Sequence, residues 1–509
     1  MSIAVLEPPR QVQKTISSPP LLERPGPALG LLLALCSFLF LYGIWQGDLY
    51  RTEGLRALLG EEFLRTGNWI VPTLYGEPLL TKPPGIYAAI AVASVPAGHV
   101  TTITARLPSV LAATLTVLLF YATFARVFGR RAGLAAAAIL PASVMWLERV
   151  PTAEIDLLQL AWVAAALLAL PRAIEEAETD TRGGWREWFW WQLALLAVAA
   201  GVLTKWTAPA FFYLSAVPLL WWRGQLRVLF RWPHLLAAAL AALPCFLWAG
   251  AAIQLAGWES FRDTVGREAL QRLSPAHHPR AYPWRELVLF PLEFLLTNLP
   301  WSAIALLALR PSFGQLWDRR GRLLWQLFHS WTWANLLFWT LVPGHRPRHG
   351  MPLQPGLAGL AALVWIAWLT GRLPWRLPRA ASAGRILVGL LGLWLVVKLG
   401  HAHYVVPTRD RDRHTHETGQ RLARLVPEGE MLYLGSLKDE GVLFYYARPA
   451  RRLSEVSGNS LPAEANYLVL TGEEWEHWSE RSSAQVIDSL HDEQGAPIVL
   501  VHRLPPRIQ

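Results

Sequence analysis

Long apolar runs dominate this sequence and determine its fold class. Segments of about 17 to 25 predominantly apolar residues, long enough to cross a bilayer as helices, recur along most of the chain. Hydrophobic residues make up 53% of the 509 residues and charged residues only 17%. A helix satisfies all its backbone hydrogen bonds internally, so it is stable in hydrocarbon. The sequence therefore predicts a polytopic α-helical membrane protein.

The positive charge of the chain reflects membrane orientation. The formal net charge is +10, and many of the arginines stand at the ends of apolar runs, where they orient helices. We therefore expect membrane lipid as a partner and no nucleic acid. The two cysteines, Cys36 and Cys245, lie inside apolar runs and are expected to be packed core residues.

Hydropathy predicts eleven spans. They cover roughly 27–46, 104–126, 132–150, 154–171, 188–203, 207–222, 234–256, 286–307, 323–342, 353–371 and 384–402. Arginines cluster on alternate loops, as they do on a cytoplasmic side. This pattern places the N-terminal tail, residues 1–26, in the cytoplasm and makes residues 27–402 the membrane domain.

The apolar run at 85–99 is too short for a span. If it crossed the bilayer, every later arginine-rich loop would move to the outer side. We therefore expect a re-entrant or interfacial element inside a large first outer loop, residues 47–103, with amphipathic helices. One of these, starting at Thr52, carries Leu55, Leu58, Leu59 and Phe63 on a single face.

Residues 403–509 differ in composition from the rest. Charged and mixed sequence alternates with four strand-like runs, "EMLYLGS", "VLFYYA", "NYLVLTG" and "PIVLVHRL". These runs predict a small soluble α/β domain, and the odd number of spans places it outside the cytoplasm.

Several predicted outer loops are rich in cations, against the orientation rule. They carry Lys82, Lys205, Arg272 and the stretch "PGHRPRHG" with His345, Arg346, Arg348 and His349. Such a cluster is suited to an anionic substrate near the membrane surface, with phosphate as the leading candidate. Among the acids, Asp156 enters the bilayer boundary at a helix start, where it is either functional or a helix cap.

These residues form the pattern of a known family. The motifs "GNWIVP", "GEPLLTKPP", "ARLPS", "FGRRAG" and "VLTK" occur in register. The chain resembles the bacterial protein O-mannosyltransferase and 4-amino-4-deoxy-L-arabinose lipid A transferase family over most of residues 27–402. The resemblance implies an inverting C-type glycosyltransferase in the bacterial cytoplasmic membrane. It would use a polyprenyl-phosphate sugar donor and a lipid, glycan or protein acceptor on the outer leaflet.

The resemblance also implies roles for individual residues. Lys82 and Lys205 match two lysines of the family, and Asp156 matches its acid at the start of the fourth span. Residues 345–349 match the basic and aromatic motif loosely, and Arg106 belongs to "ARLPS". With Arg272, these basic residues form the expected substrate-binding set, in which Lys82 contacts the donor phosphate.

One departure from the family concerns the catalytic base. Thr52 occupies the position of the family's aspartate, and threonine does not act as a base near neutral pH. The base is then Glu53, Asp48 or Asp156, or it is absent; we favour Glu53, with Asp156 positioning the reacting groups or a divalent ion. Metal use is left open. Two other readings are a transporter or lipid flippase and a non-catalytic sugar-lipid binding protein.

Overall fold

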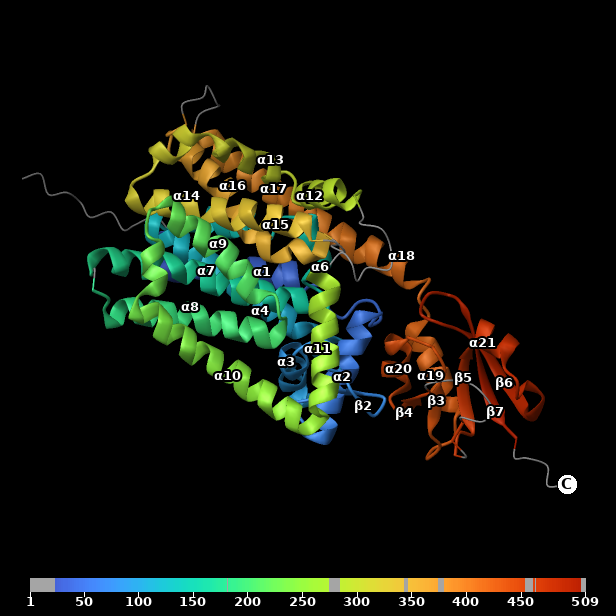
Figure 1. Cartoon of the computed structure of the whole chain (residues 1–509). Coiled ribbons are helices and arrows are strands. Elements are labelled where there is room, and N and C mark those ends of the chain that lie inside the picture. Colours follow the sequence, from blue (N-terminus) through green and yellow to red (C-terminus); the bar gives the residue numbers. More distant parts are fainter. Residues whose placement is uncertain are drawn as a thin grey trace, which may run out of the picture.

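The computed structural model describes residues 23–180, 182–273, 284–342, 347–373, 380–453, 461–462 and 464–504. The chain forms a helical body and a C-terminal α/β domain that lies at one end of it (Figure 1). This arrangement agrees with the predicted fold class.

Helices build the body throughout. They are α1 (Pro25–Cys36), α4 (Thr102–Phe128), α5 (Arg130–Ile139), α6 (Val144–Arg149), α7 (Ile155–Thr179), α8 (Trp185–Thr204), α9 (Ala208–Trp222), α10 (Trp232–Ala256), α11 (Trp258–Leu273), α12 (Glu286–Thr297), α13 (Trp301–Leu306), α14 (Arg319–His329), α15 (Asn335–Leu341), α16 (Gln354–Leu369) and α17 (Ala380–Gly400). Each of the eleven segments predicted to span contains helix.

Length and apolar composition allow six of the described helices to cross a membrane, or seven if the bent pair α12–α13 counts as one. That pair bends by 105° at its break, where Pro300 lacks the N–H that a continuous helix needs. Three shorter apolar helices add to these. The chain is therefore a multi-pass membrane protein, and the count of eleven crossings stays a prediction.

Helix α7 forms the centre of the body. It has 25 residues, and 83% of its most apolar window is buried. Alanines along it, such as Ala161 and Ala164, leave little side chain between neighbouring backbones. Helices α4 and α8 can therefore pack closely on both sides of α7.

Charged side chains gather at the two ends of α7. At its C-terminal end Glu175 and Glu178 pair with arginines of α4, of α7 itself, of the end of α9 and of the start of α14: Arg126, Arg172, Arg223, Arg319 and Arg320. Asp156 lies in the first turn, at the opposite end. The arginine-rich loops assigned to one side of the membrane by sequence thus meet at one end of the helical body.

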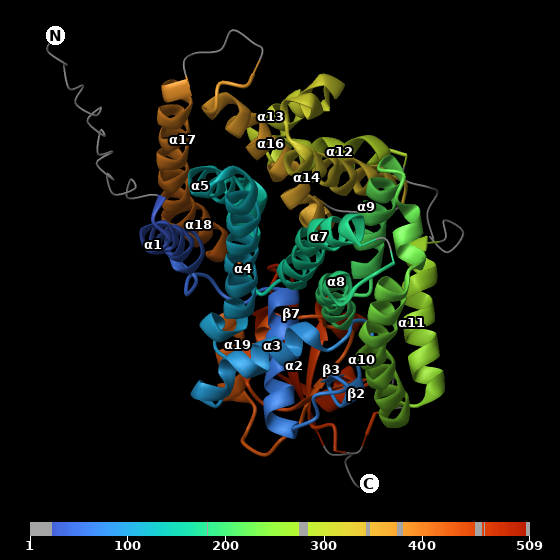
Figure 2. The ribbon, with the colours of Figure 1, turned by 90° about the vertical axis from the view of Figure 1, so that its left-hand side faces the viewer.

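The loop of residues 47–103, predicted from the sequence to be the first outer loop, lies at the Asp156 end. It contains α2 (Thr52–Thr66), a hairpin of β1 (Thr73–Leu74) and β2 (Glu77–Pro78), and α3 (Gly85–Ser94). Figure 2 shows α2 and α3 beneath α4, α7 and α8. At about 1.5 Å per residue, α3 is about 15 Å long, half the thickness of a bilayer core. This length supports the expectation that residues 85–99 do not cross.

Helix α2 differs from the single-faced amphipathic helix that the sequence suggests. Leu59 and Phe63 pack into the membrane body, whereas Leu58 packs against the C-terminal domain. The predicted apolar face is therefore divided: Leu58, assigned by the sequence to the same face as Leu59 and Phe63, packs against a second layer on another side of the helix.

The C-terminal domain contains one five-stranded mixed sheet. Its strands are β3 (Leu432–Leu434), β4 (Ala450–Arg452), β5 (Tyr467–Thr471), β6 (Ala484–His491) and β7 (Pro497–Arg503), in the order β4-β3-β5-β7-β6. β3 runs parallel to β4 and β5, and β7 runs antiparallel to β5 and β6. Helix α19 (Thr415–Leu425) precedes β3, α20 (Glu440–Tyr446) connects β3 to β4, and α21 (Gly472–His477) lies between β5 and β6.

Two details of this domain correct the sequence-based expectation. The run "VLFYYA" is not a strand: it belongs to helix α20 and ends at Ala447, whose φ is 56°. The helix buries Val442, Leu443 and Tyr446 on one side. In an apolar run this short, the sequence pattern does not distinguish a helix from a strand. Strands β4 and β6 are not among the predicted runs, because both lie at sheet edges: β4 has only three residues, and much of β6 is exposed and lacks a continuous apolar pattern.

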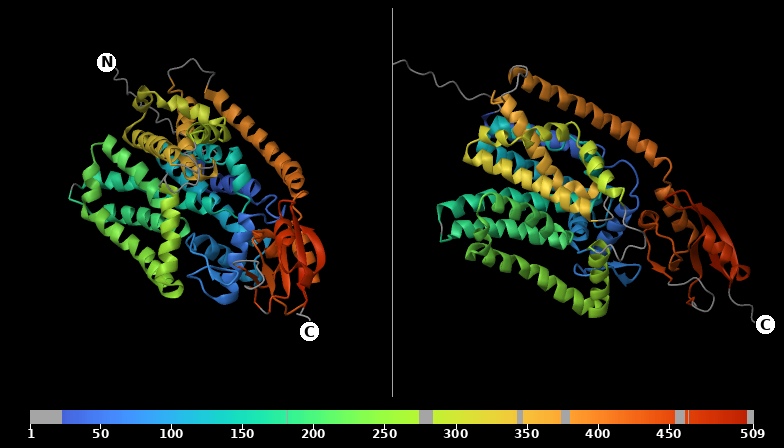
Figure 3. Two further views of the ribbon diagram at one scale, coloured as in Figure 1. Left: turned by 45° about the vertical axis from the view of Figure 1, so that its right-hand side comes forward. Right: turned by 45° about the horizontal axis from the view of Figure 1, so that its top comes forward.

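The last long helix connects body and domain. Helix α17 continues through His401–Val405 into α18 (Val406–Asp410), and Figure 3 shows it running along the outside of the body to the α/β domain. Because the domain is attached at this end, it contacts the first outer loop and not the arginine-rich loops.

The domain docks on the start of α2 at two glycines. A Cβ on Gly54 would lie 2.5 Å from the Cα of Gly441, so neither helix could approach as closely with a side chain there. The backbone N–H of Arg51 donates to Oε2 of Glu493 over 3.0 Å, and that of Leu49 donates to the Tyr445 hydroxyl over 3.0 Å. Arg51 has a φ of 50°, a conformation that costs a non-glycine residue on the order of 1 to 3 kcal/mol. The domain therefore helps to hold the start of α2.

This contact predicts a pH-dependent stability. Burial raises the pKa of Glu493 to about 7 from its ordinary 4.5. At a pH between these two pKa values, the folded protein keeps a proton on Glu493 that the unfolded chain releases. The contribution of this proton to the free energy of unfolding is complete below the ordinary pKa and is lost as the pH rises through about 7. We expect the thermal midpoint of unfolding to decrease as the pH is raised from about 5 to about 7.5, and to decrease less in Glu493→Gln. The exposed Glu476→Gln should behave like the unchanged protein; an unaltered pH dependence in Glu493→Gln would contradict the assignment.

Candidate functional site

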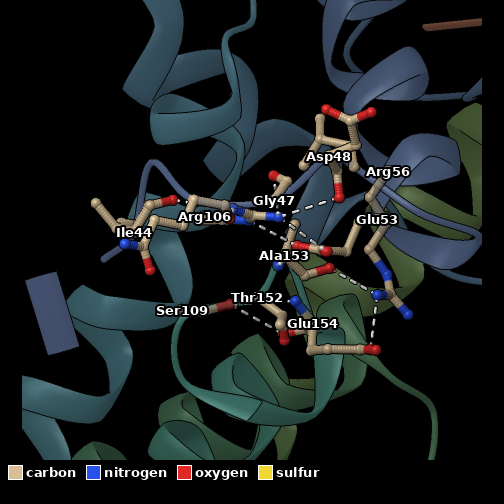
Figure 4. A network of polar contacts seen from close by, with 12 residues as sticks. Ile44, Gly47, Asp48, Glu53, Arg56, Arg106, Ser109, Thr152, Ala153 and Glu154 are labelled. Carbon is tan, nitrogen blue, oxygen red and sulfur yellow. Dashed lines mark hydrogen bonds and ion pairs between the residues drawn. The ribbon is translucent and has the colours of Figure 1, made fainter. Parts of the chain in front are cut away.

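A buried ion pair anchors the first outer loop to the body. Arg106 of α4 contacts both carboxylate oxygens of Glu53, with Nε to Oε1 at 3.0 Å and Nη2 to Oε2 at 3.2 Å (Figure 4). Its Nη1 and Nη2 groups also donate hydrogen bonds to the backbone carbonyls of Ile44, Gln46, Gly47 and Asp48. The backbone N–H of Ala153 donates to Oε1 of Glu53 over 2.7 Å. Arg106 and Glu53 thus tie the end of the first helix, the start of α2 and the segment before α7 together.

A second buried pair lies on the other side of that segment. Nη1 of Arg56 is 2.6 Å from Oε2 of Glu154 and also donates to the Ala153 carbonyl over 2.6 Å. Burial lowers the pKa of Arg56, but the Glu154 and Asp156 carboxylates raise it more, so the guanidinium remains charged. The Thr52 hydroxyl lies 3.4 Å from Oε1 of Glu154. The residue at the family's aspartate position therefore faces a carboxylate supplied by another part of the chain.

Asp156 and Lys205 form a third pair. Nζ of Lys205 donates to Oδ1 of Asp156 over 2.6 Å, and both residues are buried. Asp156 starts α7, and Lys205 directly follows the end of α8. Since α7 and α8 pack side by side, the two predicted site residues meet at the ends of neighbouring helices. Asp156 also interacts electrostatically with His349 and Arg56.

The motif "KPPG" packs directly against the Lys205 turn. A Cβ on Gly85 would lie 2.7 Å from the Leu203 carbonyl oxygen and 2.8 Å from Oγ1 of Thr204. Only glycine lets the start of α3 approach the end of α8 this closely. Lys82, three residues earlier, is half-buried, and its Nζ donates to the carbonyl of Thr81. The two lysines singled out in the sequence thus belong to segments that touch.

The basic stretch before α16 also reaches this site. Nη1 of Arg348 lies 3.6 Å from Oε1 of Glu154, and Nη1 of Arg149 lies 3.9 Å from the same oxygen. His345 and Arg346 lie outside the described residues. Arg272 is in α11, and its side chain is likewise outside what the structure describes. The structure therefore brings Arg348 and His349 to the other predicted residues and leaves the remaining three untested.

Three of these residues were not selected from the sequence as site residues: Arg56, Arg149 and Glu154. Arg56 lies one helical turn after Thr52 and so projects from the same face of α2. Glu154 stands at the helix boundary beside Asp156, where a carboxylate is costly unless it is paired. The sequence therefore contains a signal for Arg56 and for Glu154 as site residues, but none for Arg149.

The charges at the start of α7 do not balance. Among the described contacts, four cations surround two carboxylates: Arg56, Arg149, Arg348 and Lys205 against Glu154 and Asp156. Low polarity strengthens electrostatic interactions here, because the surroundings are largely buried. The surplus of two positive charges is suited to a phosphate group. No group of three metal-binding side chains is found in the described part of the chain.

Comparison with known proteins supports the same interpretation. Residues 81–249 match the family described as dolichyl-phosphate-mannose-protein mannosyltransferase. The chain is 27% identical over 406 residues to the undecaprenyl phosphate-alpha-4-amino-4-deoxy-L-arabinose arabinosyl transferase 2 of Pseudomonas fluorescens (strain Pf0-1), covering 76% of this chain and 68% of the relative. The corresponding transferase of Pseudomonas aeruginosa (strain LESB58) is 28% identical over 62% of this chain and 55% of its own length.

The fold matches as well. ArnT from Cupriavidus metallidurans, solved bound to undecaprenyl phosphate, superposes with a TM-score of 0.71 at 16% identity over 93% of this chain and 97% of that one. The chain therefore resembles these membrane glycosyltransferases in both sequence and fold. The archaeal oligosaccharyltransferase AglB from Archaeoglobus fulgidus shares the fold more distantly, with a TM-score of 0.52 at 13% identity over 88% of this chain and 69% of that one. The family resemblance seen in the sequence is therefore confirmed.

The Asp156–Lys205 pair predicts a measurable asymmetry between single and double variants. Asp156→Asn leaves the buried lysine uncompensated and should lower the free energy of unfolding by about 3 to 5 kcal/mol. Asp156→Asn combined with Lys205→Met removes both charges and should recover most of that loss. Thermal unfolding in detergent would compare the two; a double variant no more stable than the single one would contradict a direct pair.

Proposed function

We propose that this protein transfers a sugar from a polyprenyl-phosphate donor to an acceptor on a lipid, glycan or protein. Its curated relatives are named for undecaprenyl-phosphate-linked arabinosyl transfer, and a structural neighbour was solved with undecaprenyl phosphate. The chain spans 55% and 68% of the length of the two relatives described above, so donor and acceptor are proposals for this chain.

The observation that carries this proposal is the surplus of cations at the start of α7. A polyprenyl phosphate leaves the sugar as a phosphate monoester, whose charge grows as the glycosidic bond breaks. Cations already in place, in a site of low polarity, lower that barrier without reorganising. Arg348 and Arg149 approach Glu154 at 3.6 and 3.9 Å, longer than a normal hydrogen bond, so they can turn to a phosphate at little cost.

The contacts favour Glu154 over Glu53 as the base. Glu53 receives two hydrogen bonds from Arg106 and one from the Ala153 N–H, and this arrangement suits a residue that positions α2. Glu154 presents Oε1 to the Thr52 hydroxyl, at the position where the family carries its aspartate. We propose that Glu154 takes over the function of that missing carboxylate.

The reaction then follows from this placement. The Glu154 carboxylate accepts the proton of the acceptor hydroxyl, whose oxygen attacks the anomeric carbon from the face opposite the phosphate. The bond from the anomeric carbon to the phosphate oxygen breaks, and its electron pair remains on the polyprenyl phosphate. Lys205, Lys82 and Arg348 stabilise that leaving group. The configuration at the anomeric carbon inverts.

We further propose an orientation in the bacterial inner membrane. The arginine-rich end of α7 lies in the cytoplasm, since that is where arginines accumulate. The site and the C-terminal domain then face the opposite side, and the N-terminal tail lies inside. An external site suits a donor that is carried in the membrane and an acceptor in the cell envelope.

An assay of sugar transfer tests the proposed activity. The purified protein should move radiolabelled 4-amino-4-deoxy-L-arabinose from undecaprenyl phosphate to lipid A, the reaction suggested by its relatives. Lys82→Met should slow transfer on the order of a hundredfold or more, because a cation at the leaving group is lost. Arg385→Met removes an exposed cation from α17 and should have no effect. A near-normal rate in Lys82→Met would refute the role of Lys82.

A carboxylate exchange tests the assignment of the base. Glu154→Gln should reduce the rate about 10²- to 10⁴-fold, the usual contribution of a general base. Adding Thr52→Asp to Glu154→Gln should restore part of the rate, because a carboxylate returns at the position next to residue 154. Should Glu154→Gln remain active while Glu53→Gln is inactive but folded, the base is Glu53.

A further inference from the structure

A polar cavity lies behind the Arg106–Glu53 pair. It has a volume of about 100 Å³. One wall is formed by Glu53, Arg106 and the segment at Pro151 and Thr152, and the other by the outer end of α17 and its continuation. A space of this size holds a few water molecules or one small anion.

One helical face supplies the second wall. Lys398, His401, Ala402, Val406 and Arg409 line the cavity at helical spacings and so lie on one side of the helix. Arg413, in the turn just after α18, completes this wall. The sequence does not mark any of them as a site residue, because they fall within or just after an apolar run.

Among the residues that the structure describes, Lys398 has no partner for its charge. The residue is 2% exposed, and its ammonium group makes no hydrogen bond or ion pair with any residue that the structure describes. A lysine at a helix end normally extends its ammonium group to water, but this one is enclosed. An uncompensated buried charge is costly, and a partner from outside the chain would remove that cost.

His401 also lacks a partner for a buried polar atom among the described residues. Its Nε2 is buried and lacks a hydrogen-bond partner among the described residues. It follows Lys398 by three positions, so both side chains lie on the same face of the helix. One ligand in this cavity can therefore contact both polar groups.

The charge balance of the cavity selects an anion. Arg409 pairs with Glu148 at 3.1 Å, and Arg106 pairs with Glu53 at 3.0 Å. These pairs neutralise both carboxylates that line the cavity. Lys398 remains, with Arg413, whose guanidinium stacks over the ring of Tyr50 at 4.3 Å. The remaining charge in the cavity is positive.

The cavity is separated from the phosphate site proposed above. The segment 151–154 divides the two: Pro151 and Thr152 line the cavity, while Glu154 faces Arg56. Glu53 borders the cavity and also holds this segment through Ala153. A ligand in the cavity would thus lie next to the reaction centre, on the side away from Lys205.

We propose that this cavity binds a phosphate-type anion, with Lys398 and His401 as its principal ligands. Its position beside Glu53 suits a phosphate on the acceptor, an assignment that rests on the proposed transferase function. The same chemistry is present in the head group of a membrane phospholipid. Both sources supply a compact anion that pairs with Lys398 and accepts a hydrogen bond from His401.

Phosphate binding by the full-length protein tests this site. The protein is placed in nanodiscs of uncharged phosphatidylcholine, with undecaprenyl phosphate present to fill the donor site, and inorganic phosphate is titrated by calorimetry. Lys398→Met should weaken phosphate binding at least tenfold, because a charge-assisted contact is lost. Arg385→Met, on the same helix but outside the cavity, should bind as the unchanged protein does. His401→Phe should also weaken binding, which covers the case in which Lys398→Met alone is poorly folded.

The titration separates this proposal from the proposed function. If undecaprenyl phosphate does not bind, the transferase proposal fails, yet a loss of phosphate binding in Lys398→Met but not in Arg385→Met would still support the cavity. Equal affinity in Lys398→Met, His401→Phe and the unchanged protein overturns it. Tighter binding of glucosamine 1-phosphate than of glycerol 3-phosphate assigns the cavity to a phosphorylated acceptor sugar, and the reverse order assigns it to a lipid head group.

Discussion

Paired charges at the start of α7 are the interaction on which this structure depends. Glu154 and Asp156 lie at the boundary of an apolar body, where isolated carboxylates would be too costly to bury. Each is compensated by a cation from a separate segment, Arg56 from α2 and Lys205 from the end of α8. Because each pair joins distant parts of the chain, the contacts that make the charges tolerable also assemble the site.

The position of α2 follows from the same constraint. Glu53 and Arg56 attach one face of the helix to the membrane body, and Gly54 brings the other face against Gly441 of the C-terminal domain. A helix held on both sides has little freedom to move, which suits a segment that must present groups at fixed distances to a reacting bond. The soluble domain therefore contributes to the precision of the site without entering it.

The two cation-rich regions differ in how their charges are used. At the start of α7 the cations surround carboxylates and leave a surplus for a leaving phosphate. In the cavity behind Glu53 the carboxylates are already neutralised, and Lys398 remains without a partner among the described residues. Under the functions proposed here, the segment 151–154 would separate a donor phosphate from a second anion, with the attacking group between them.

The sequence by itself determined the helical membrane body, the α/β domain and the family resemblance, because apolar length, composition and local motifs are properties of neighbouring residues. It also selected Asp156 and Lys205, since charges that oppose the orientation rule are visible without coordinates. Only the tertiary structure showed that Thr52 faces Glu154, that α2 is covered on both faces and that "VLFYYA" is helical. It alone revealed Lys398 as a buried charge without a partner among the described residues. Pairing, burial and the choice between helix and strand in a short apolar run depend on residues far away in the chain, and no local pattern records them.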